Sequence, residues 1–442
     1  MAEILPFKGI RYNLNKVGDL ALVVSPPYDV ISQEEQENYY KLHPYNVIRL
    51  IFGKDLPGDT EEENKYTRAA RYFQEWMNQR ILVQDEQPAI YLYRQDYRLP
   101  YEEKEKSLTG FIALVHIDEA TSSNTIYPHE HTMPATVADR LNVVKACKAD
   151  LSPLFALYSD RESQIRSILV SEMQAQPILK LKDLEEVQHQ VWRIQNTEKI
   201  KAIQSKIRNK ALVIADGHHR YEAAKLFRDY MWALDPHPSE FKLYNYVMMQ
   251  LVAIEDEGLT IFPIHRLVRG LSNFKEDLFL KQLEQFFHID TFKLDEKEKT
   301  AKVSFILNRL RMDSELSHRF FVYSGQNKVY GLTLKDLKAY EQIADLTLPE
   351  VLRNLDVSIL QTLIFDHILE GKEKPLEISY TREEGKALEL IDTGQYQIAF
   401  LLSPTRVSQV VEVATLRRRM PPKSTYFYPK PLTGIVMNKI SW

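Results

Sequence analysis

The sequence predicts an α+β protein with two domains. Helix and strand patterns alternate irregularly along the chain, and no internal repeat is present. A chain of 442 residues also exceeds what one hydrophobic core usually organises. The pattern changes near residue 270, where a lysine-rich run of helix, strand and helix begins. We therefore expect a first domain at residues 1–270. The second, at residues 271–442, is a mixed α/β region with a final segment that is a candidate to return to the active site.

Several elements follow from hydrophobic spacing. TEEENKYTRAARYFQEWMNQRIL has the spacing of an amphipathic helix, whereas AIYLYRQDYRL alternates as a strand does, and TGFIALVHI and YNYVMMQLVAI run apolar like buried strands. HPYNVIRLIFG is expected to lead into a strand. Residues 118–140 are predicted to form a long functional loop, because they are rich in Thr, Ser, Pro and His. A helix is expected to begin within LNVVKACKA.

Composition excludes several classes of protein. The net charge of −4 gives no global attraction to nucleic acid or to an anionic membrane. The start, MAEILPFKGIRYN, lacks a secretory signal, and no apolar run approaches the roughly 20 residues of a membrane span, so a cytoplasmic protein is expected. Cys147 is the single cysteine, which excludes an intramolecular disulfide and a cysteine-rich zinc site, and we expect it to be buried.

Residues 211–227, ALVIADGHHRYEAAKLF, carry the strongest functional signal. A short apolar strand ends in charged residues and continues directly as a helix. The first N–H groups of a helix lack intrahelical partners and carry the positive end of its dipole, so this junction can bind phosphate. Gly217 permits close backbone approach, Arg220 offers a bidentate fork, and His218 and His219 add donors.

Asp216 does not fit a simple anion site, because a carboxylate repels phosphate. Three interpretations remain open: Asp216 caps the helix, it shares a divalent metal with the phosphate, or it acts as a general base toward a hydroxyl. Capping alone requires neither the two histidines nor the arginine. The expected buried face of the helix is formed by residues further along the chain: Ala223, Ala224, Phe227, Tyr230 and Met231.

Two loops nearer the N-terminus hold further candidates. In IYPHEHTMPATVADR, His129 and His131 flank Glu130. The histidines are candidate metal ligands, Glu130 is a candidate base or metal-bound carboxylate, and a solvated polar loop is the alternative. In SPPYDVIS, two prolines present Tyr28 and Asp29 rigidly, which suits a substrate-facing loop as well as a structural turn.

The segment 416–434, LRRRMPPKSTYFYPKPLTG, interleaves basic and aromatic residues. Such a segment can bind single-stranded nucleic acid or close over a nucleotide and its phosphates, and an exposed basic surface is the third interpretation. The near-neutral charge of the whole chain favours the nucleotide, and Lys423 is the candidate phosphate ligand.

These motifs together resemble a known family. SPPYDVIS, HPYNVIRL, YPHEHT, LSPLFALYSD, IADGHHRYEAA, HRLV and MPPKSTYFYPKPLTG occur in order over nearly the whole chain. They resemble a bacterial and archaeal family catalogued as a domain of unknown function. The ADGHHRYEAA box is similar to the phosphate-binding box of the ParB and sulfiredoxin superfamily. That superfamily includes a free serine kinase with a comparable Asp-Gly-His-His-Arg signature.

The resemblance implies a ParB/sulfiredoxin-like nucleotide-binding core. It assigns nucleotide binding to the run from Gly217 to Arg220 and the catalytic aspartate of the kinase to Asp216. The partner glutamate of the kinase has no motif match here, and Glu130 is our candidate for it. The DNA-reading helices of ParB have no recognisable counterpart, so nucleic acid is not the expected partner.

The leading hypothesis is therefore a small-molecule phosphotransferase, with a free serine kinase as its model. It would move a phosphoryl group between ATP or ADP and a hydroxyl such as that of serine, with Mg²⁺ offsetting the charge of Asp216. The same site with water as acceptor would act as a phosphoserine phosphatase.

Two alternatives from other classes accompany this hypothesis. A metal-dependent hydrolase would use His129, His131 and either His218 or His219 as ligands. A non-catalytic, nucleotide-gated or DNA-associated ParB-like protein would use the same phosphate site and place residues 416–434 on nucleic acid.

Overall fold

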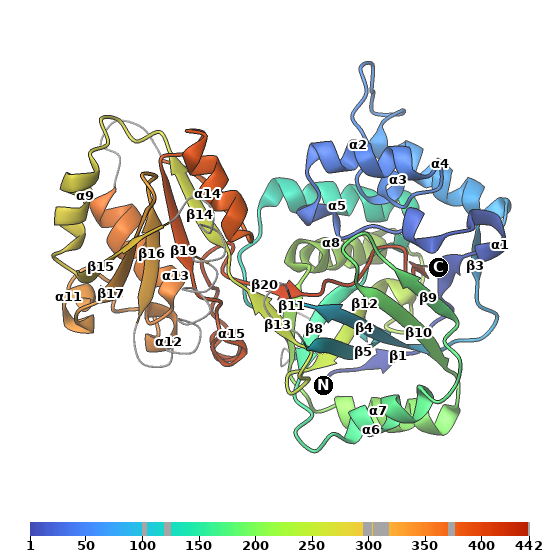
Figure 1. Cartoon of the computed structure of the whole chain (residues 1–442). Helices are drawn as coiled ribbons and strands as arrows, with labels where there is room; N and C mark the ends of the chain where they lie inside the picture. The colour runs from blue at the N-terminus through green and yellow to red at the C-terminus, as the bar shows by residue number, and fades with distance from the viewer. Residues whose placement is uncertain (100–103, 119–124, 295–302, 304–317, 370–375, 441–442) are drawn as a thin grey trace. The chain divides into compact units, whose positions relative to one another are not determined.

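The computed structural model describes residues 1–99, 104–118, 125–294, 303, 318–369 and 376–440. The chain forms two compact units, and each is described by itself (Figure 1). Unit 1 comprises Met1–Pro128, Thr132–Thr260 and Pro429–Trp442, and unit 2 comprises His129–His131 and Ile261–Tyr428. The mixed helix and strand content confirms the predicted α+β class. The sequence places the boundary near residue 270, whereas the chain leaves unit 1 at Thr260 and returns to it at Pro429.

Unit 1 is built on a nine-stranded mixed sheet. Its strand order is β6-β11-β8-β12-β5-β4-β10-β9, with β1 beside β5. Two of the pairings, β6 with β11 and β8 with β12, are parallel, and the others are antiparallel. The strands are β1 (Ile4–Leu5), β4 (Ile90–Arg98), β5 (Glu105–His116), β6 (Ile126–Pro128), β8 (Leu154–Tyr158), β9 (Leu179–Lys182), β10 (Gln188–Ile194), β11 (Leu212–Asp216) and β12 (Tyr246–Ala253). Two further pairs are β2 (Ile10–Tyr12) with β3 (Leu82–Gln84) and β7 (Ala149–Asp150) with β21 (Asn438–Lys439).

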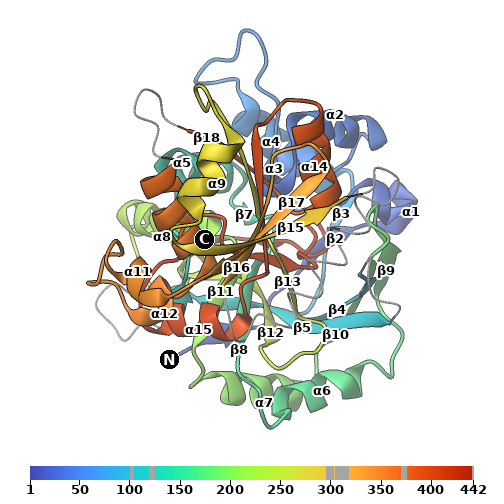
Figure 2. The ribbon, with the colours of Figure 1, turned by 60° about the vertical axis from the view of Figure 1, so that its left-hand side comes forward.

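The helices of unit 1 cover both faces of this sheet. They are α1 (Leu14–Val17), α2 (Gln33–Leu42), α3 (Ile48–Ile51), α4 (Lys65–Asn78), α5 (Pro134–Cys147), α6 (Gln164–Glu172), α7 (Thr197–Ile207) and α8 (His218–Leu234), with short 3₁₀ turns η1 (Leu20–Leu22), η2 (Tyr28–Val30) and η3 (Leu243–Asn245). Helices α6 and α7 lie side by side along one face (Figures 1 and 2).

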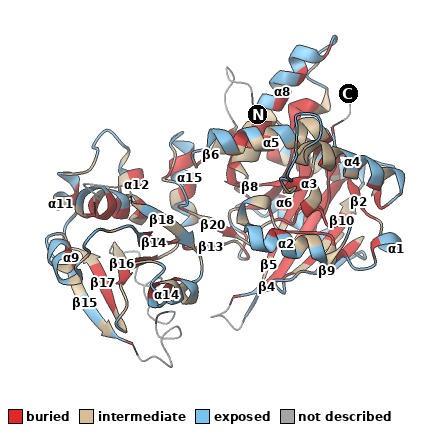
Figure 3. Ribbon diagram, turned by 90° about the horizontal axis from the view of Figure 1, so that it is seen from above, coloured by how far each residue is buried: buried red, intermediate tan, exposed pale blue. Residues whose placement is uncertain are grey.

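Side chains alternate between two apolar clusters because successive strand residues point to opposite faces of the sheet. In β5, Phe111, Ala113 and Val115 face the cluster that includes α6 and α7. Ile112 and Leu114 of the same strand face the other cluster, with α3, α4 and β2. The strands are accordingly buried on both sides, whereas the helices expose their outer surfaces (Figure 3).

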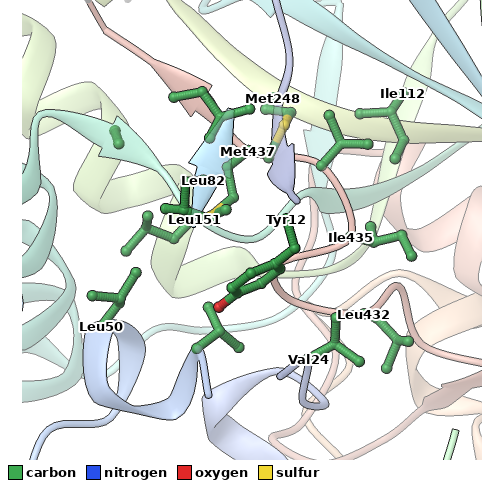
Figure 4. Close-up of a cluster of buried hydrophobic side chains, with 14 of the residues drawn as sticks. Tyr12, Val24, Leu50, Leu82, Ile112, Leu151, Met248, Leu432, Ile435 and Met437 are labelled. Atoms are coloured by element: carbon green, nitrogen blue, oxygen red, sulfur yellow. The ribbon is translucent and has the colours of Figure 1, made fainter. Parts of the chain in front are cut away.

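The C-terminal segment of the chain belongs to the second of these clusters. Leu432, Ile435 and Met437 pack among residues from distant parts of unit 1, including Tyr12 and Met248 (Figure 4). Thr433 and Ser25 exchange backbone hydrogen bonds, and Met437 does the same with Ile10. This segment is therefore an internal part of the core of unit 1.

Unit 2 holds a six-stranded antiparallel sheet in the order β15-β17-β16-β19-β14-β18. Helix α14 packs its Ala387, Leu388 and Ile391 on one face. The strands are β14 (His265–Arg269), β15 (Phe287–Lys293), β16 (Arg319–Tyr323), β17 (Lys328–Leu334), β18 (Glu377–Thr381) and β19 (Ile398–Leu402), and β13 (Thr260–Phe262) pairs with β20 (Tyr426–Tyr428). The helices are α9 (Glu276–Leu283), α11 (Leu337–Glu341), α12 (Glu350–Arg353), α13 (Asp356–Ile359), α14 (Glu384–Asp392), α15 (Val407–Thr415) and the π-helix η4 (Leu360–Ile368).

Three local predictions differ from the structure. The apolar run after HPYN forms the short helix α3 instead of a strand. Within the predicted loop 118–140, β6 and the first half of α5 are ordered elements, and residues 119–124 lie outside the described residues. Tyr230 was expected on the buried face of α8 but is 42% exposed, with Lys145 Nζ 4.0 Å from the centre of its ring. Cys147 is buried, as predicted.

Candidate functional site

The candidate site begins where β11 ends and α8 starts. All five residues of β11 are buried, and the strand register shifts between Ile214 and Asp216. Gly217 follows with φ = 97° and is the N-cap residue of α8. A Cβ atom there would lie 3.1 Å from both Arg220 Nη2 and Leu154 Cγ, so glycine suits both the left-handed backbone and the space. Asp216 precedes the N-cap position, and therefore it does not cap the helix in the usual way.

Asp216 lies between two cations. Arg220 Nη2, one helical turn further on, donates to Asp216 Oδ2 over 2.7 Å, and Lys430 Nζ contacts Oδ1. The three side chains are 8%, 11% and 9% exposed, respectively. Buried carboxylates are usually paired, because an uncompensated charge in the interior is costly. The charge of Asp216 is thus offset by side chains of the chain itself.

Arg220 also connects this junction to a neighbouring loop. Its Nη1 donates to Ser152 Oγ over 2.8 Å and to the carbonyl oxygen of Pro153 over 2.7 Å. Thr433 Oγ1 lies 3.0 Å from Ser152 Oγ, so the C-terminal segment belongs to the same network. The sequence predicts a guanidinium fork at Arg220 that binds phosphate, whereas in the structure much of this fork bonds to Ser152, Pro153 and Asp216.

The two histidines differ in their surroundings. His218 is buried at the first position of α8. The Nε2 atom of His219 accepts a hydrogen bond from the backbone N–H of Met133 over 3.0 Å, which leaves Nδ1 to carry the proton when the ring is neutral. The first intrahelical hydrogen bond of α8 runs from Tyr221 N to Gly217 O. The N–H groups before it therefore lie at the positive end of the helix dipole.

A pocket of unit 1 adjoins this junction. Its empty space is about 550 Å³ when the open solvent at its mouth is included. Tyr28 of the SPPYDVIS loop, Arg140 of α5 and Arg220 of α8 all line it. The Arg140 guanidinium carbon lies 3.7 Å from the centre of the Tyr28 ring, within cation–π distance. Three segments singled out in the sequence therefore meet at one pocket.

The pKa of Tyr28 reflects the charged side chains around the pocket. Burial raises the pKa of the Tyr28 hydroxyl well above its ordinary value, and Asp29 raises it further. The nearby Arg140 and Arg220 oppose this increase, whereas Asp216 adds to it. Tyr28 is therefore a neutral hydrogen-bonding group at physiological pH. Its neighbour Asp29 is exposed on η2.

The remaining candidates belong to unit 2. His129 is 1% exposed, its Nε2 lies 3.1 Å from Thr425 Oγ1, and its carbonyl oxygen accepts from Met420 N. Glu130 Oε1 accepts a hydrogen bond from Lys423 N over 3.2 Å, and His131 is exposed.

Neither of the two predicted metal arrangements is assembled. Over the described ranges, no three His, Cys, Asp or Glu side chains are grouped so that they could hold a metal ion. The site also does not fit Mg²⁺ at Asp216, because each of its oxygens contacts a cationic side chain.

Lys430 and the buried polar side chains that hold its segment are site residues that the sequence patterns do not predict. Gln95 Nε2 donates to the carbonyl oxygen of Lys430 over 3.0 Å, and Gln250 Nε2 donates to Gln95 Oε1 over 3.2 Å. Tyr93 OH accepts from Leu432 N and lies 2.7 Å from His189 Nδ1. The sequence does contain an indication of this network, because Gln95 and Gln250 lie within apolar strands, where a buried amide requires hydrogen-bond partners.

The fold and the junction define an α+β protein with a charged strand-to-helix turn in its larger unit. The chain belongs to the DUF1015 family, whose description is "protein of unknown function", and residues 4–358 match its model. No curated protein matches the chain. No helix among the residues that the structure describes is long and apolar enough to cross a membrane.

Solved structures with distant similarity include three proteins. A free serine kinase in complex with AMP is 12% identical with a TM-score of 0.32, over 75% of this chain and 92% of that chain. C-terminally truncated SbnI from Staphylococcus aureus is 11% identical with a TM-score of 0.35, over 73% and 85%. A conserved hypothetical protein from Pyrococcus furiosus is 13% identical with a TM-score of 0.30, over 69% and 87%.

Proposed function

We propose that this protein is a small-molecule phosphotransferase that transfers a phosphoryl group between a nucleotide and a hydroxyl compound, with serine as the first candidate acceptor. One observation carries the proposal: the Asp216 carboxylate is held between Arg220 and Lys430 at the start of α8, next to the left-handed Gly217. The resemblance of the ADGHHRYEAA box to the ParB and sulfiredoxin superfamily supports the same assignment.

The charges of this cluster favour a phosphate. Two cations and one carboxylate sum to one net positive charge. The N-terminus of α8 adds the equivalent of roughly half an elementary charge. Asp216 on its own would repel a nucleotide, but together with Arg220 and Lys430 it forms a cationic group that is fixed in place.

The chemistry requires positioning more than covalent catalysis. The hydroxyl oxygen of the acceptor bonds to the terminal phosphorus as the bond from that phosphorus to the nucleotide oxygen breaks. The hydroxyl proton leaves to a base or to solvent. In this proposal Asp216 fixes Lys430 and Arg220 for the phosphates and orients the acceptor hydroxyl, and all three residues belong to unit 1.

The test is a transfer assay on the full chain. ATP or ADP is incubated with serine and other hydroxyl compounds, with and without Mg²⁺, and phosphorylated product is measured by mass spectrometry. We expect Asp216→Asn to lose transfer by at least about a hundredfold, because it removes the carboxylate that orients the acceptor hydroxyl. Nucleotide affinity should stay within a few fold, because the loss of a repulsive charge offsets the weaker contacts with Arg220 and Lys430. Wild-type transfer rates in Asp216→Asn would remove this residue from the mechanism.

A matched pair of lysine variants tests the phosphate site. Lys430→Met is expected to weaken nucleotide binding about tenfold or more, because it removes the cation that contacts Asp216. Lys423→Met is the comparison, since Lys423 is the phosphate ligand predicted from the sequence, and the structure shows its backbone N–H donating to Glu130. A larger loss for Lys423→Met than for Lys430→Met would contradict the proposed site.

A further inference from the structure

The pocket beside Arg220 has an apolar lining that serine, with its short polar side chain, does not use. Most of its lining is aliphatic and includes Val143 and Val144 from α5 and Ala223 and Ala224 from α8, two helices that pack against each other. The two small alanines leave the space open between these helices. Serine has only a hydroxymethyl side chain, so it would leave this aliphatic lining without an apolar partner.

Its polar lining groups carry opposite charges. Arg140 Nη1 donates to the carbonyl oxygen of Ile51, and Nε and Nη2 donate to Asp139. A guanidinium has five N–H donors, so these contacts leave two of them for a ligand. A planar, bidentate acceptor such as a carboxylate matches a guanidinium best.

Asp150 supplies the negative charge. Its Oδ2 accepts a hydrogen bond from Asn438 Nδ2 over 3.0 Å, but no basic side chain among the described residues pairs with it. Burial raises the pKa of the Asp150 carboxyl to about 6, and the hydrogen bonds from Asn438 and from Met248 N oppose that increase. The group is still mostly ionised at pH 7.5. A half-buried carboxylate that has no basic partner is stabilised by a cationic ligand.

We propose that this pocket binds the phosphoryl acceptor, and that the acceptor is a hydroxylated amino acid with a larger, more apolar body than serine. Its carboxylate faces Arg140, its ammonium faces Asp150, and its apolar part lies between α5 and α8. The role of this ligand as phosphoryl acceptor rests on the proposed function, whereas its binding to the pocket does not. A neutral nucleotide base fits less well, because it would leave both Asp150 and the remaining Arg140 donors without charged partners.

Calorimetric binding to the full chain, with and without AMP, tests this without requiring turnover. The probes are L-serine and 3-hydroxyleucine, which differ by one isopropyl group on the hydroxyl-bearing carbon. We expect 3-hydroxyleucine to bind at least about tenfold more tightly than serine. Its carboxamide, and the hydroxy acid that lacks its amino group, should each bind at least about tenfold more weakly than 3-hydroxyleucine. Equal or tighter binding of serine would overturn the proposal.

Variants locate the binding in this pocket. Ala224→Leu fills the space beside Arg220 and should weaken 3-hydroxyleucine binding about tenfold or more, while AMP binding stays within a few fold. Ala233→Leu, at an exposed position on the same helix, is the control and should change neither affinity. Loss of AMP binding in Ala224→Leu, with the amino acid unaffected, would assign the pocket to the nucleotide instead. If 3-hydroxyleucine binds as expected and no transfer occurs, the pocket assignment stands and the proposed function fails.

Discussion

At the scale of single residues, the fold changes the pKa of side chains in unit 1, and Asp150 is the clearest case. Burial raises the pKa of its carboxyl from about 4 to about 6. Between about pH 4 and pH 6, the carboxyl of Asp150 therefore binds its proton more tightly in the folded state than in the unfolded state. The free energy of unfolding therefore decreases as pH rises from about 4 to about 6, and the cost persists above that range.

Asp150→Asn should remove this cost. We expect it to raise the free energy of unfolding at pH 8 by at most about 3 kcal/mol, with the gain disappearing near pH 4. Urea denaturation at pH 4, 6 and 8 measures the difference. Asp345→Asn is the control, because hydrogen bonds to Thr347 lower the pKa of this exposed carboxyl, so no gain at pH 8 is expected. A gain for Asp150→Asn that did not change with pH would contradict the assignment.

The charged junction shows which residues can be read from a sequence. Asp216, Gly217 and Arg220 are close along the chain, and the strand-to-helix pattern is local, so their proximity is predictable. Lys430 lies 214 positions from Asp216. Its contact depends on how the C-terminal segment crosses the sheet, and no local pattern encodes that crossing. Lys423 and Lys430 look equally suitable in the sequence for this reason.

At the scale of elements, strand β4 supports the site by holding the backbone of the C-terminal segment. Its residues Tyr93, Gln95 and Tyr97 point to one face of the sheet because side chains alternate along a strand. Tyr93 and Gln95 hold the backbone at Leu432 and Lys430, whereas Tyr97 OH donates to the carbonyl oxygen of Gly258. The strand thus offers a functional position and a comparison position two residues apart.

Gln95→Leu should displace Lys430 as well as weaken the core. It leaves the carbonyl oxygen of Lys430 and the amide of Gln250 without their partner, which costs about 1–3 kcal/mol of stability. We expect nucleotide affinity to fall about fivefold or more. Tyr97→Phe removes a buried hydrogen bond from the same face and should cost similar stability with nucleotide affinity unchanged. Thermal unfolding measures the stability of both variants, and titration with nucleotide measures their affinity. Equal nucleotide affinities of Gln95→Leu and Tyr97→Phe would mean that Gln95 has only a structural role.

Short elements were predicted less well than long ones. Helix α4 and strands β4, β5 and β12 have at least eight residues each, so their periodicity is distinct. Helix α3 has four residues, three of them apolar, and so short a run fits either a helix or a strand. Asn46 decides between them by accepting a hydrogen bond from Ile48 N and donating to the carbonyl oxygens of Leu22 and Val24. The contacts with Leu22 and Val24 involve a separate segment of the chain, so a local stretch of sequence does not predict them.

At the scale of the whole molecule, the path of the chain is the feature that sequence patterns describe least. The chain leaves unit 1 at Thr260, builds unit 2, and returns at Pro429. Composition and periodicity identify several long elements of unit 1, but they do not state which segment completes which core. The final segment reads in the sequence as basic and aromatic, and yet its last apolar residues belong to the interior of unit 1.

This path predicts that unit 1 cannot fold without the end of the chain. Residues 429–440 bury five apolar side chains, namely those of Leu432, Ile435, Val436, Met437 and Ile440. At roughly 1.5–3 kcal/mol each, their burial contributes at least about 7 kcal/mol, which is comparable to the whole stability of a typical domain. A chain that stops at Tyr428 should therefore lose the cooperative unfolding transition of unit 1 and expose its amides to rapid hydrogen exchange. A chain that stops at Lys439 removes only the Ile440 side chain from that set, and it should keep the transition with a modestly lower midpoint. Slow exchange in β5 and β12 of the shorter chain would show that unit 1 folds without this segment.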